Sequence, residues 1–233
     1  KHTKIPVIAS INCYSSKGWT EFAREIAAAG ADALEINVFF LPHDRKEGPA
    51  EAEKLYLDLV EKIVPAIGIP VSIKLGSRFS NILHIVDQFY MRGVRGVVMF
   101  NRFYEPDIDT RTMQIVPAPV FSTPSDMRYV LRWIAMASAQ DIRIDISAST
   151  GVHDGDDAIK YILAGAHTVQ VCSVLYEKGV SYLSEMNDKI SGWMDAKGFR
   201  SIGEFRGKLN WRNYQKPSVF ERTQFMKYFS ASD

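Results

Sequence analysis

The chain has 233 residues, of which 46% are hydrophobic and 24% charged, and its formal net charge is +1. This composition predicts one soluble globular domain, residues 1–233, with a full hydrophobic core. The near-neutral charge and the lack of a long apolar run or a signal peptide disfavour nucleic acid and membranes as partners and favour the cytoplasm.

Apolar runs alternate with amphipathic runs along the whole chain. The apolar runs predict buried strands, and the amphipathic runs predict helices. In the first helix Phe22 and Ile26 are expected to face the core. Thr123-Pro124 predicts the start of the fourth helix, with Thr123 as its N-cap. The predicted strands are 5–12, 33–39, 70–74, 96–100, 142–146 and 168–171, and the predicted helices are 18–29, 50–66, 80–92, 123–138, 154–165 and 179–197.

Strands that alternate with helices predict a parallel α/β sheet. Six strands are too few for a closed (β/α)8 barrel, so a barrel needs two further strand–helix units before Lys1, and the chain does not begin with Met. An open, doubly wound sheet is the alternative. Residues 102–123 are too many for an ordinary strand-to-helix connection and predict a small β-excursion or a lid.

The most informative stretch is 142–173, whose pattern is strand, loop, helix, strand and loop. Ser149, Thr150 and Gly151 follow the first of these strands, and Cys172 and Ser173 follow the second. Small residues let backbone N–H groups approach a ligand, and in (β/α)8 barrels the loops after the last two strands commonly hold a phosphate. We therefore expect a phosphate cradle here. The alternative is a strand–helix–strand unit that packs in the fold without binding a ligand, with its small residues serving tight turns.

Four further polar residues, Asn12, Asn37, Lys74 and Asn101, lie where predicted strands end. Each alone has a structural explanation, since Asn commonly ends strands and a lone Lys is usually solvated. At one edge of a parallel sheet, however, amides can bind the N–H and C=O groups of a planar ring, and a lysine can stabilise negative charge on a reduced flavin. Glu35, buried in the same strand as Asn37, needs a partner.

Histidines and cysteines give weaker signals. His43 lies in a polar loop after the second strand and could reach a substrate, although solvation is its more ordinary role. His153 and Asp154 are expected to cap a helix rather than to act in catalysis. Cys13 and Cys172 lack the spacing of metal ligands, so no metal is expected, and a disulfide framework is not expected in a chain of this size.

Several runs together carry a resemblance. The most specific is Leu-Ala-Gly-Ala-His-Thr-Val-Gln-Val-Cys-Ser at 163–173. Weaker runs are Pro-Val-Ile-Ala-Ser-Ile-Asn at 6–12, Ala-Gly-Ala-Asp-Ala-Leu-Glu-Ile-Asn at 29–37, Val-Ser-Ile-Lys-Leu at 71–75, Ser-Thr-Gly-Val with Gly-Asp-Asp-Ala at 149–158, and Gly-Phe-Arg-Ser-Ile-Gly-Glu-Phe-Arg-Gly-Lys-Leu at 198–209. From Pro6 to about Leu209 the chain resembles the dihydroorotate dehydrogenase family.

The resemblance implies a TIM barrel that binds FMN and oxidises dihydroorotate to orotate in pyrimidine biosynthesis, as a homodimer. It also implies an upstream segment with a further flavin-binding lysine and part of a substrate loop. Asn37 and Asn101 match the amides that hold the pyrimidine ring, and Lys74 is expected to stabilise the reduced flavin. The residues at flavin-binding positions are Asn12, Asn37, Lys74, Ser122, Ser149, Thr150, Gly151, Cys172 and Ser173.

The chain departs from the family pattern at the catalytic base. After the asparagine of the second strand the family has Asn-x-x-Cys/Ser-Pro-Asn, in which Cys or Ser removes a proton from dihydroorotate, whereas Phe40 stands there in this chain. Arg102 replaces a serine after the substrate asparagine, and Thr150 replaces a phosphate-loop glycine. His43 could supply a base if its loop folds over the flavin.

The residues and the resemblance leave four hypotheses open. The first is an FMN-dependent oxidoreductase acting on dihydroorotate, and the second keeps FMN but takes another planar substrate. The third is a barrel that binds a phosphate ligand without catalysis. The fourth is a phosphate-binding isomerase or aldolase, for which Lys74 is the only lysine candidate.

Overall fold

The computed structural model describes residues 3–13 and 18–224 of the chain. Its main feature is one sheet of six parallel strands, which confirms the predicted α/β alternation. The strand order in space follows the order along the chain and never reverses, as in a barrel wall and unlike a doubly wound sheet. In spatial order the strands are β1 (Ile8–Cys13), β2 (Ala33–Val38), β3 (Val71–Leu75), β4 (Gly96–Met99), β7 (Asp145–Ala148) and β8 (Thr168–Val169).

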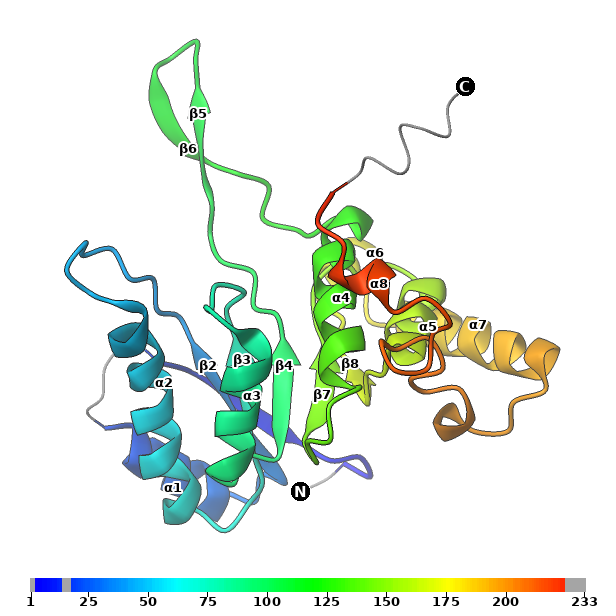
Figure 1. Cartoon of the computed structure of the whole chain (residues 1–233), viewed down its shortest axis with the longest axis horizontal. Helices are drawn as coiled ribbons and strands as arrows, with labels where there is room; N and C mark the ends of the chain where they lie inside the picture. Colours follow the sequence, from blue (N-terminus) through cyan, green and yellow to red (C-terminus); the bar gives the residue numbers. More distant parts are fainter. Residues whose placement is uncertain (1–2, 14–17, 225–233) are drawn as a thin grey trace.

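Helices connect the consecutive strands and flank the curved sheet (Figure 1). Their ends follow local sequence signals: Thr123 and Asp126 form a capping box, and the side chain of Asp154 accepts from the backbone N–H of Asp157. The helices are α1 (Trp19–Ala28), α2 (Pro49–Ile63), α3 (Ile82–Met91), α4 (Met127–Ala137), α5 (Gly155–Ala164), α6 (Ser173–Lys178), α7 (Tyr182–Lys197) and α8 (Ser218–Glu221), with short 3-10 turns η1 (Val64–Ala66), η2 (Pro124–Asp126) and η3 (Ile202–Glu204).

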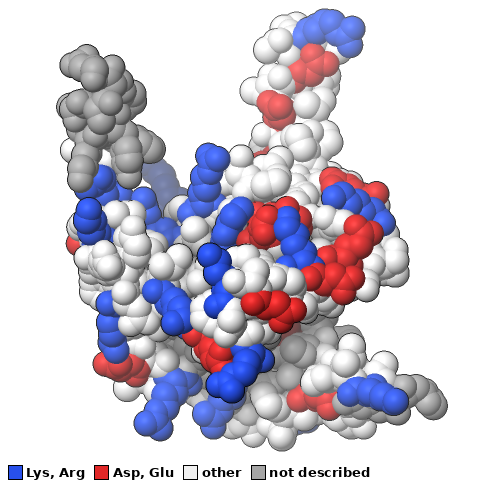
Figure 2. Space-filling model, turned by 90° about the vertical axis from the view of Figure 1, so that its right-hand side faces the viewer, with Lys and Arg blue, Asp and Glu red and all other residues white. Residues whose placement is uncertain are grey.

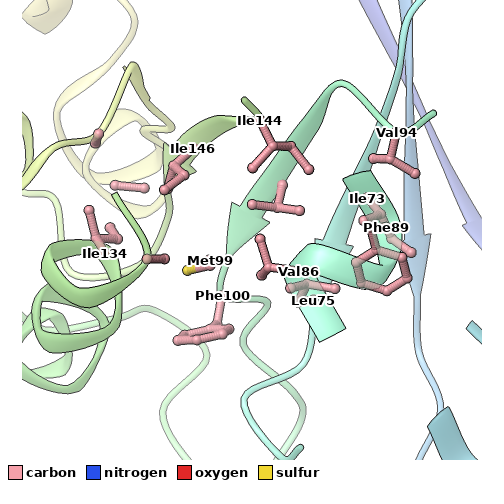
Figure 3. Close-up of a cluster of buried hydrophobic side chains, with 14 of the residues drawn as sticks. Ile73, Leu75, Val86, Phe89, Val94, Met99, Phe100, Ile134, Ile144 and Ile146 are labelled. Carbon is pink, nitrogen blue, oxygen red and sulfur yellow. The ribbon is translucent and has the colours of Figure 1, made fainter. Parts of the chain in front are cut away.

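The hydrophobic core lies between one face of the sheet and the helices. Ile73 of β3 and Met99 of β4 are fully buried there, and Phe89 of α3 and Ile134 of α4 pack toward the same layer (Figure 3). Because side chains alternate along a strand, the residues between these apolar positions point to the opposite face. The core therefore leaves the second face of the sheet for polar side chains.

Two sequence-based expectations for the fold are wrong in detail. Phe22 is 63% exposed, and the buried residue of α1 is its neighbour Ala23. The first strand is not buried on both sides, because β1 is an edge strand whose Ile8 is exposed. The helix predicted over 179–197 is present as α7, and a separate short helix that was not predicted, α6, begins at Ser173 directly after the loop of β8.

The long connection at 102–123 contains an antiparallel hairpin, so the predicted β-excursion is confirmed. Its strands, β5 (Pro106–Asp109) and β6 (Gln114–Pro117), stand away from the rest of the molecule (Figure 1). Arg102 closes the base of this arm by donating to the carbonyl oxygens of Val120 at 2.5 Å and Pro119 at 2.8 Å. Arg102, which the resemblance aligns with a serine, therefore anchors a loop.

The molecular surface mixes charges of both signs. On the face shown in Figure 2, basic and acidic side chains are interspersed. This pattern agrees with a net charge of +1. Among the residues that the structure describes, no helix is long and apolar enough to cross a bilayer.

Candidate active site

The face of the sheet opposite the core carries polar side chains on several neighbouring strands. Strand pairing places Asn12 beside Asn37 and Asn37 beside Lys74, and it places Ser10 beside Glu35 two residues earlier. Two-residue periodicity puts these side chains on the same face as one another. The predicted polar edge is thus a polar layer inside the curve of the sheet.

Three asparagines in this layer form a chain of amides. The Nδ2 of Asn37 donates to Oδ1 of Asn12 at 2.9 Å, and Nδ2 of Asn101 donates to Oδ1 of Asn37 at 2.7 Å. Both ends of the buried Asn37 amide are therefore used. Within the described part of the chain, Nδ2 of Asn12 and Oδ1 of Asn101 have no hydrogen-bond partner, which leaves one donating NH2 group and one accepting oxygen for a ligand.

A second network joins a lysine to a buried carboxylate through one glutamine. Lys74 donates from Nζ to Oε1 of Gln170 at 2.9 Å, and Nε2 of Gln170 donates to Oε2 of Glu35 at 2.6 Å. The other oxygen of Glu35 accepts from the hydroxyl of Ser10 at 2.9 Å. Glu35 is only 6% exposed, so these bonds satisfy a charge that would otherwise be costly to bury. They also hold the Lys74 ammonium in the layer rather than in bulk solvent.

The turn after β7 contains two consecutive residues in the left-handed region of backbone conformation. Thr150 and Gly151 both have positive φ, 82° and 77°. A Cβ on Gly151 would lie 2.6 Å from the backbone nitrogen of Met127, so only glycine fits against the start of α4. The hydroxyl of Tyr161 donates to the Thr150 carbonyl at 2.7 Å. Burial, together with the carboxylates of Asp157 and Asp126, raises the pKa of Tyr161, so this donor stays protonated.

Backbone donors without protein acceptors gather in this turn and in the one after β8. Of the residues at 3–13 and 18–224, none accepts from the backbone N–H groups of Gly151, Val152, Cys172 or Ser173. The Gln170 N–H donates to the Ala148 carbonyl at 2.8 Å, which holds the two strand ends side by side. Unpaired N–H groups from two adjacent turns are suited to an anion.

Side chains from a third loop complete this group. The backbone N–H of Ser122 donates to Oγ of Ser173 at 3.1 Å, and the two hydroxyl oxygens lie 3.1 Å apart. The Oγ of Ser122 is also 3.3 Å from Nε2 of His153. The structure therefore brings Ser122 and Ser173 together, and it adds His153, which was expected only to cap a helix.

Some predicted residues support the turn through contacts of their own. Ser149 donates its backbone N–H to the Met99 carbonyl, and the Thr150 hydroxyl donates to the Phe100 carbonyl. The Cys172 side chain is exposed. His43 is exposed on the loop after β2, where its Nδ1 lies 3.3 Å from the Leu41 carbonyl oxygen. Among the residues that the structure describes, no hydrogen bond or ion pair joins His43 to the asparagines or to Lys74.

Two hollows open at the ends of β3 and β4. One, of about 280 Å³, is walled by aromatic side chains, including Phe40 and Phe79. The other, of about 220 Å³, reaches Asn101 and Thr150. Arg78 lines both, and within the described residues its guanidinium has no hydrogen-bond partner.

Gln170, Ser10 and His153 were not predicted as members of the site. The sequence could have indicated Gln170, because it lies two residues after Thr168 in the run 163–173, which carries the most specific resemblance. Two-residue periodicity puts its side chain on the same face of the sheet as that of Thr168. The contact of His153 with Ser122 spans 31 residues, and nothing in the local sequence indicates it.

Comparison with known proteins decides the family. The family model described as "Dihydroorotate dehydrogenase" matches residues 1–194. The chain belongs to the dihydroorotate dehydrogenase family. The six-stranded sheet is accordingly part of a TIM barrel, and the expectation of an oxidoreductase is confirmed at the level of the family.

Curated relatives in the family are similar at low identity. A dihydroorotate dehydrogenase B (NAD(+)) catalytic subunit of Thermoplasma volcanium is 27% identical over 89% of this chain and 69% of its own length. The chloroplastic dihydropyrimidine dehydrogenase (NADP(+)) of Arabidopsis thaliana is 28% identical over 88% of this chain and 52% of its own. A dihydroorotate dehydrogenase A (fumarate) of Limosilactobacillus reuteri is 28% identical over 73% and 57%. The chain thus spans roughly half to two thirds of these relatives.

Proposed function

We propose that this protein is an FMN-dependent oxidoreductase that acts on a carbon–carbon single bond of a planar ring, with dihydroorotate as the first candidate substrate. One observation carries the proposal: unpaired backbone N–H groups of two neighbouring turns lie at the edge of a polar layer that holds Lys74. A phosphate at the turns and a flavin ring against the layer would use both features. Pyrimidine biosynthesis, a cytoplasmic location and a homodimer stay predictions.

The residues present fit FMN. The phosphate would accept from the N–H groups of Gly151, Val152, Cys172 and Ser173. The hydroxyl of Ser147 is buried without a partner within the described residues, and its strand position puts it on the same face as Lys74. An orphaned buried hydroxyl and a lysine with unused N–H donors are both suited to the polar edge of a flavin. When bound, FMN would supply the hydride acceptor.

The roles of the protein groups follow from their hydrogen-bonding capacity. Lys74 is positioned to stabilise negative charge on the reduced ring, because Gln170 occupies only one of its three N–H donors. Asn12 and Asn101 offer the free donor and acceptor of the amide chain to ring C=O and N–H groups. Asn37 holds both of them in register.

FMN titration tests the proposal directly. Adding FMN to the purified full-length chain should quench flavin fluorescence and give an equimolar yellow complex. The Lys74→Met variant should still bind FMN but lower its reduction potential by roughly 20–60 mV, equivalent to about 1–3 kcal/mol for one charge-assisted contact. Lys197→Met, on the exposed side of α7, is the matched control and should leave the potential unchanged. A chain that takes up no FMN would refute the proposal.

A second candidate keeps FMN and changes the substrate. Neither Phe40 nor Leu41, which precede Pro42 after the second strand, can accept a proton. Phe40 instead lines an aromatic hollow beside Arg78, a setting suited to a ring with an apolar face and an anionic group. The lack of a proton acceptor at Phe40 and Leu41 is the observation that favours this second candidate.

Anaerobic mixing with dihydroorotate separates the two candidates. Rapid bleaching of the bound flavin would support dihydroorotate and exclude the second candidate, whereas unchanged flavin absorbance would exclude dihydroorotate. If bleaching is seen, His43→Gln tests whether His43 supplies the base. That variant should slow bleaching and leave FMN affinity unchanged, because His43 is exposed and makes no contact with the turns.

A further inference from the structure

Three loops that are far apart in the sequence place an imidazole next to two hydroxyls. Ser122 comes from the connection before η2, His153 from the turn before α5, and Ser173 from the start of α6. Nε2 of His153 lies 3.3 Å from Oγ of Ser122, which lies 3.1 Å from Oγ of Ser173. The backbone N–H of Ser173 is one of the unpaired donors. The Ser122 hydroxyl therefore lies between the imidazole of His153 and Ser173, the residue that carries this donor.

The cluster is largely withdrawn from solvent and has one acidic neighbour. Ser122 is 9% exposed, and the side chain of His153 is 16% exposed. Nδ1 of His153 faces the carboxylate of Glu177, on α6, at 3.8 Å. This carboxylate favours a proton on Nδ1, which leaves Nε2 of the neutral ring to accept from the Ser122 hydroxyl.

The other charged groups around the histidine are already paired. The Asp157 carboxylate accepts from the backbone N–H of His153 and bonds Lys160 at 2.9 Å. On α7, Lys189 pairs with Asp154 and with Asp156. In η2, the carboxylate of Asp126 forms the capping box with Thr123. Glu177 is thus the charged group that faces the ring itself.

We propose that His153 and Ser122 form a proton-coupled contact to the phosphate of the ligand. When the anion binds, Nε2 of the imidazole takes up one proton from solvent and keeps it, and the resulting N–H donates a hydrogen bond to Oγ of Ser122. The Ser122 hydroxyl no longer donates to Nε2 and instead donates a hydrogen bond to a phosphate oxygen. No covalent bond is formed or broken, and the added positive charge lies between Glu177 and the anion. The inference rests on the proposed function, because it assumes that the turns hold a phosphate.

Comparing FMN with riboflavin, which lacks the phosphate, isolates this contact. For wild type we expect much tighter binding of FMN than of riboflavin. His153→Gln should weaken FMN binding roughly tenfold or more, the effect expected for a hydrogen bond to a charged group, and leave riboflavin binding unchanged. His84→Gln, an exposed position on α3, is the matched control and should change neither affinity.

Proton uptake gives an independent reading of the same contact. Calorimetric titration of FMN in two buffers of different ionisation enthalpy should show proton uptake by wild type that is lost in His153→Gln. Ser122→Ala should reproduce the loss of FMN affinity, and thermal unfolding of both variants verifies that they fold.

The outcomes separate failure of the inference from failure of the proposed function. If wild type prefers FMN but His153→Gln binds it as tightly as wild type, or loses FMN and riboflavin affinity equally, the inference is wrong and the phosphate site stands. Equal binding of FMN and riboflavin by wild type, or no binding of either, overturns both.

Discussion

Gln170 sets the hydrogen-bonding state of two charged side chains at once. Lysine can only donate and a carboxylate can only accept, so the amide must turn Oε1 to Lys74 and Nε2 to Glu35, as observed. A leucine of similar volume would leave a buried carboxylate short of a donor. Such an unsatisfied group costs more than the net value of the bond that is lost.

Gln170→Leu should therefore lower the free energy of unfolding by about 1–3 kcal/mol. Urea denaturation of the two proteins measures this difference. Gln114→Leu, on the exposed hairpin, is the control and should change stability by no more than about 0.5 kcal/mol. A Gln170→Leu protein as stable as wild type would show that the network does not satisfy Glu35.

His167 predicts a pH dependence of stability. Burial lowers the pKa of His167, and the positive charge of Arg206 lowers it further. The carboxylate of Asp145, 3.4 Å from Nε2 of His167, opposes this shift. Its Nδ1 accepts from the backbone N–H of Ile146 at 3.1 Å, a bond that only the unprotonated nitrogen can make. A lowered pKa means that the unfolded chain binds more protons between the two pKa values. The contribution of His167 is therefore full above about pH 6.5 and is lost as the pH falls through the folded-state pKa.

Denaturation curves between about pH 5 and pH 7.5 test this sign. The stability of wild type should fall on acidification, and His167→Gln should flatten that fall, because glutamine does not titrate. A steeper fall in the variant would contradict the assignment.

At the scale of the elements, the turn between β7 and α5 is shaped by its packing on α4. Gly151 and Gly198 have nearly the same positive φ, 77° and 74°. An added Cβ would meet Met127 at Gly151 and open space at Gly198. The two positions therefore separate the cost of the conformation from the cost of the contact.

Gly198→Ala should cost about 1–2 kcal/mol, the usual penalty for a non-glycine residue in the left-handed region. Gly151→Ala should cost at least about 1 kcal/mol more, because α4 or the turn must move. It should also weaken FMN binding, whereas Gly198→Ala should not. Equal losses of stability at the two positions would show that α4 does not constrain the turn.

The sequence predicts these elements unevenly, for physical reasons. Caps such as Thr123 and Asp154 are local signals, and both helices start where predicted or within a few residues of it. The prediction that Phe22 faces the core was wrong because the apolar residues of α1 cover two adjacent faces of the helix. Only packing in the folded protein decides that Ala23 is the buried one. β7 begins at Asp145 rather than at Ile142, since pairing with β4, not propensity, sets its start.

The candidate site shows the same division between local and long-range information. Asn12, Asn37 and Lys74 could be predicted because parallel strands bring their ends to one edge. The role of Gln170 depends on a contact across 135 residues with Glu35. His153 was expected to cap α5, yet it is Asp154 that caps it, and the side chain of His153 faces another loop.

At the scale of the whole molecule, the curved sheet separates two functions. Its outer face is apolar and packs on the helices, so it supplies stability, while its inner face gathers charged and amide groups that contribute little to packing. In a TIM barrel the carboxyl ends of the strands are where ligands bind. The unpaired N–H groups and the free amide ends all lie at that end of the sheet.

Backbone amide NMR spectra recorded during titrations with FMN and with riboflavin test the central claim most directly. The account predicts that FMN, but not riboflavin, shifts the amide resonances of Gly151, Val152, Cys172 and Ser173 together, because these N–H groups acquire a common phosphate acceptor. Binding of FMN that leaves these four resonances in place would contradict it.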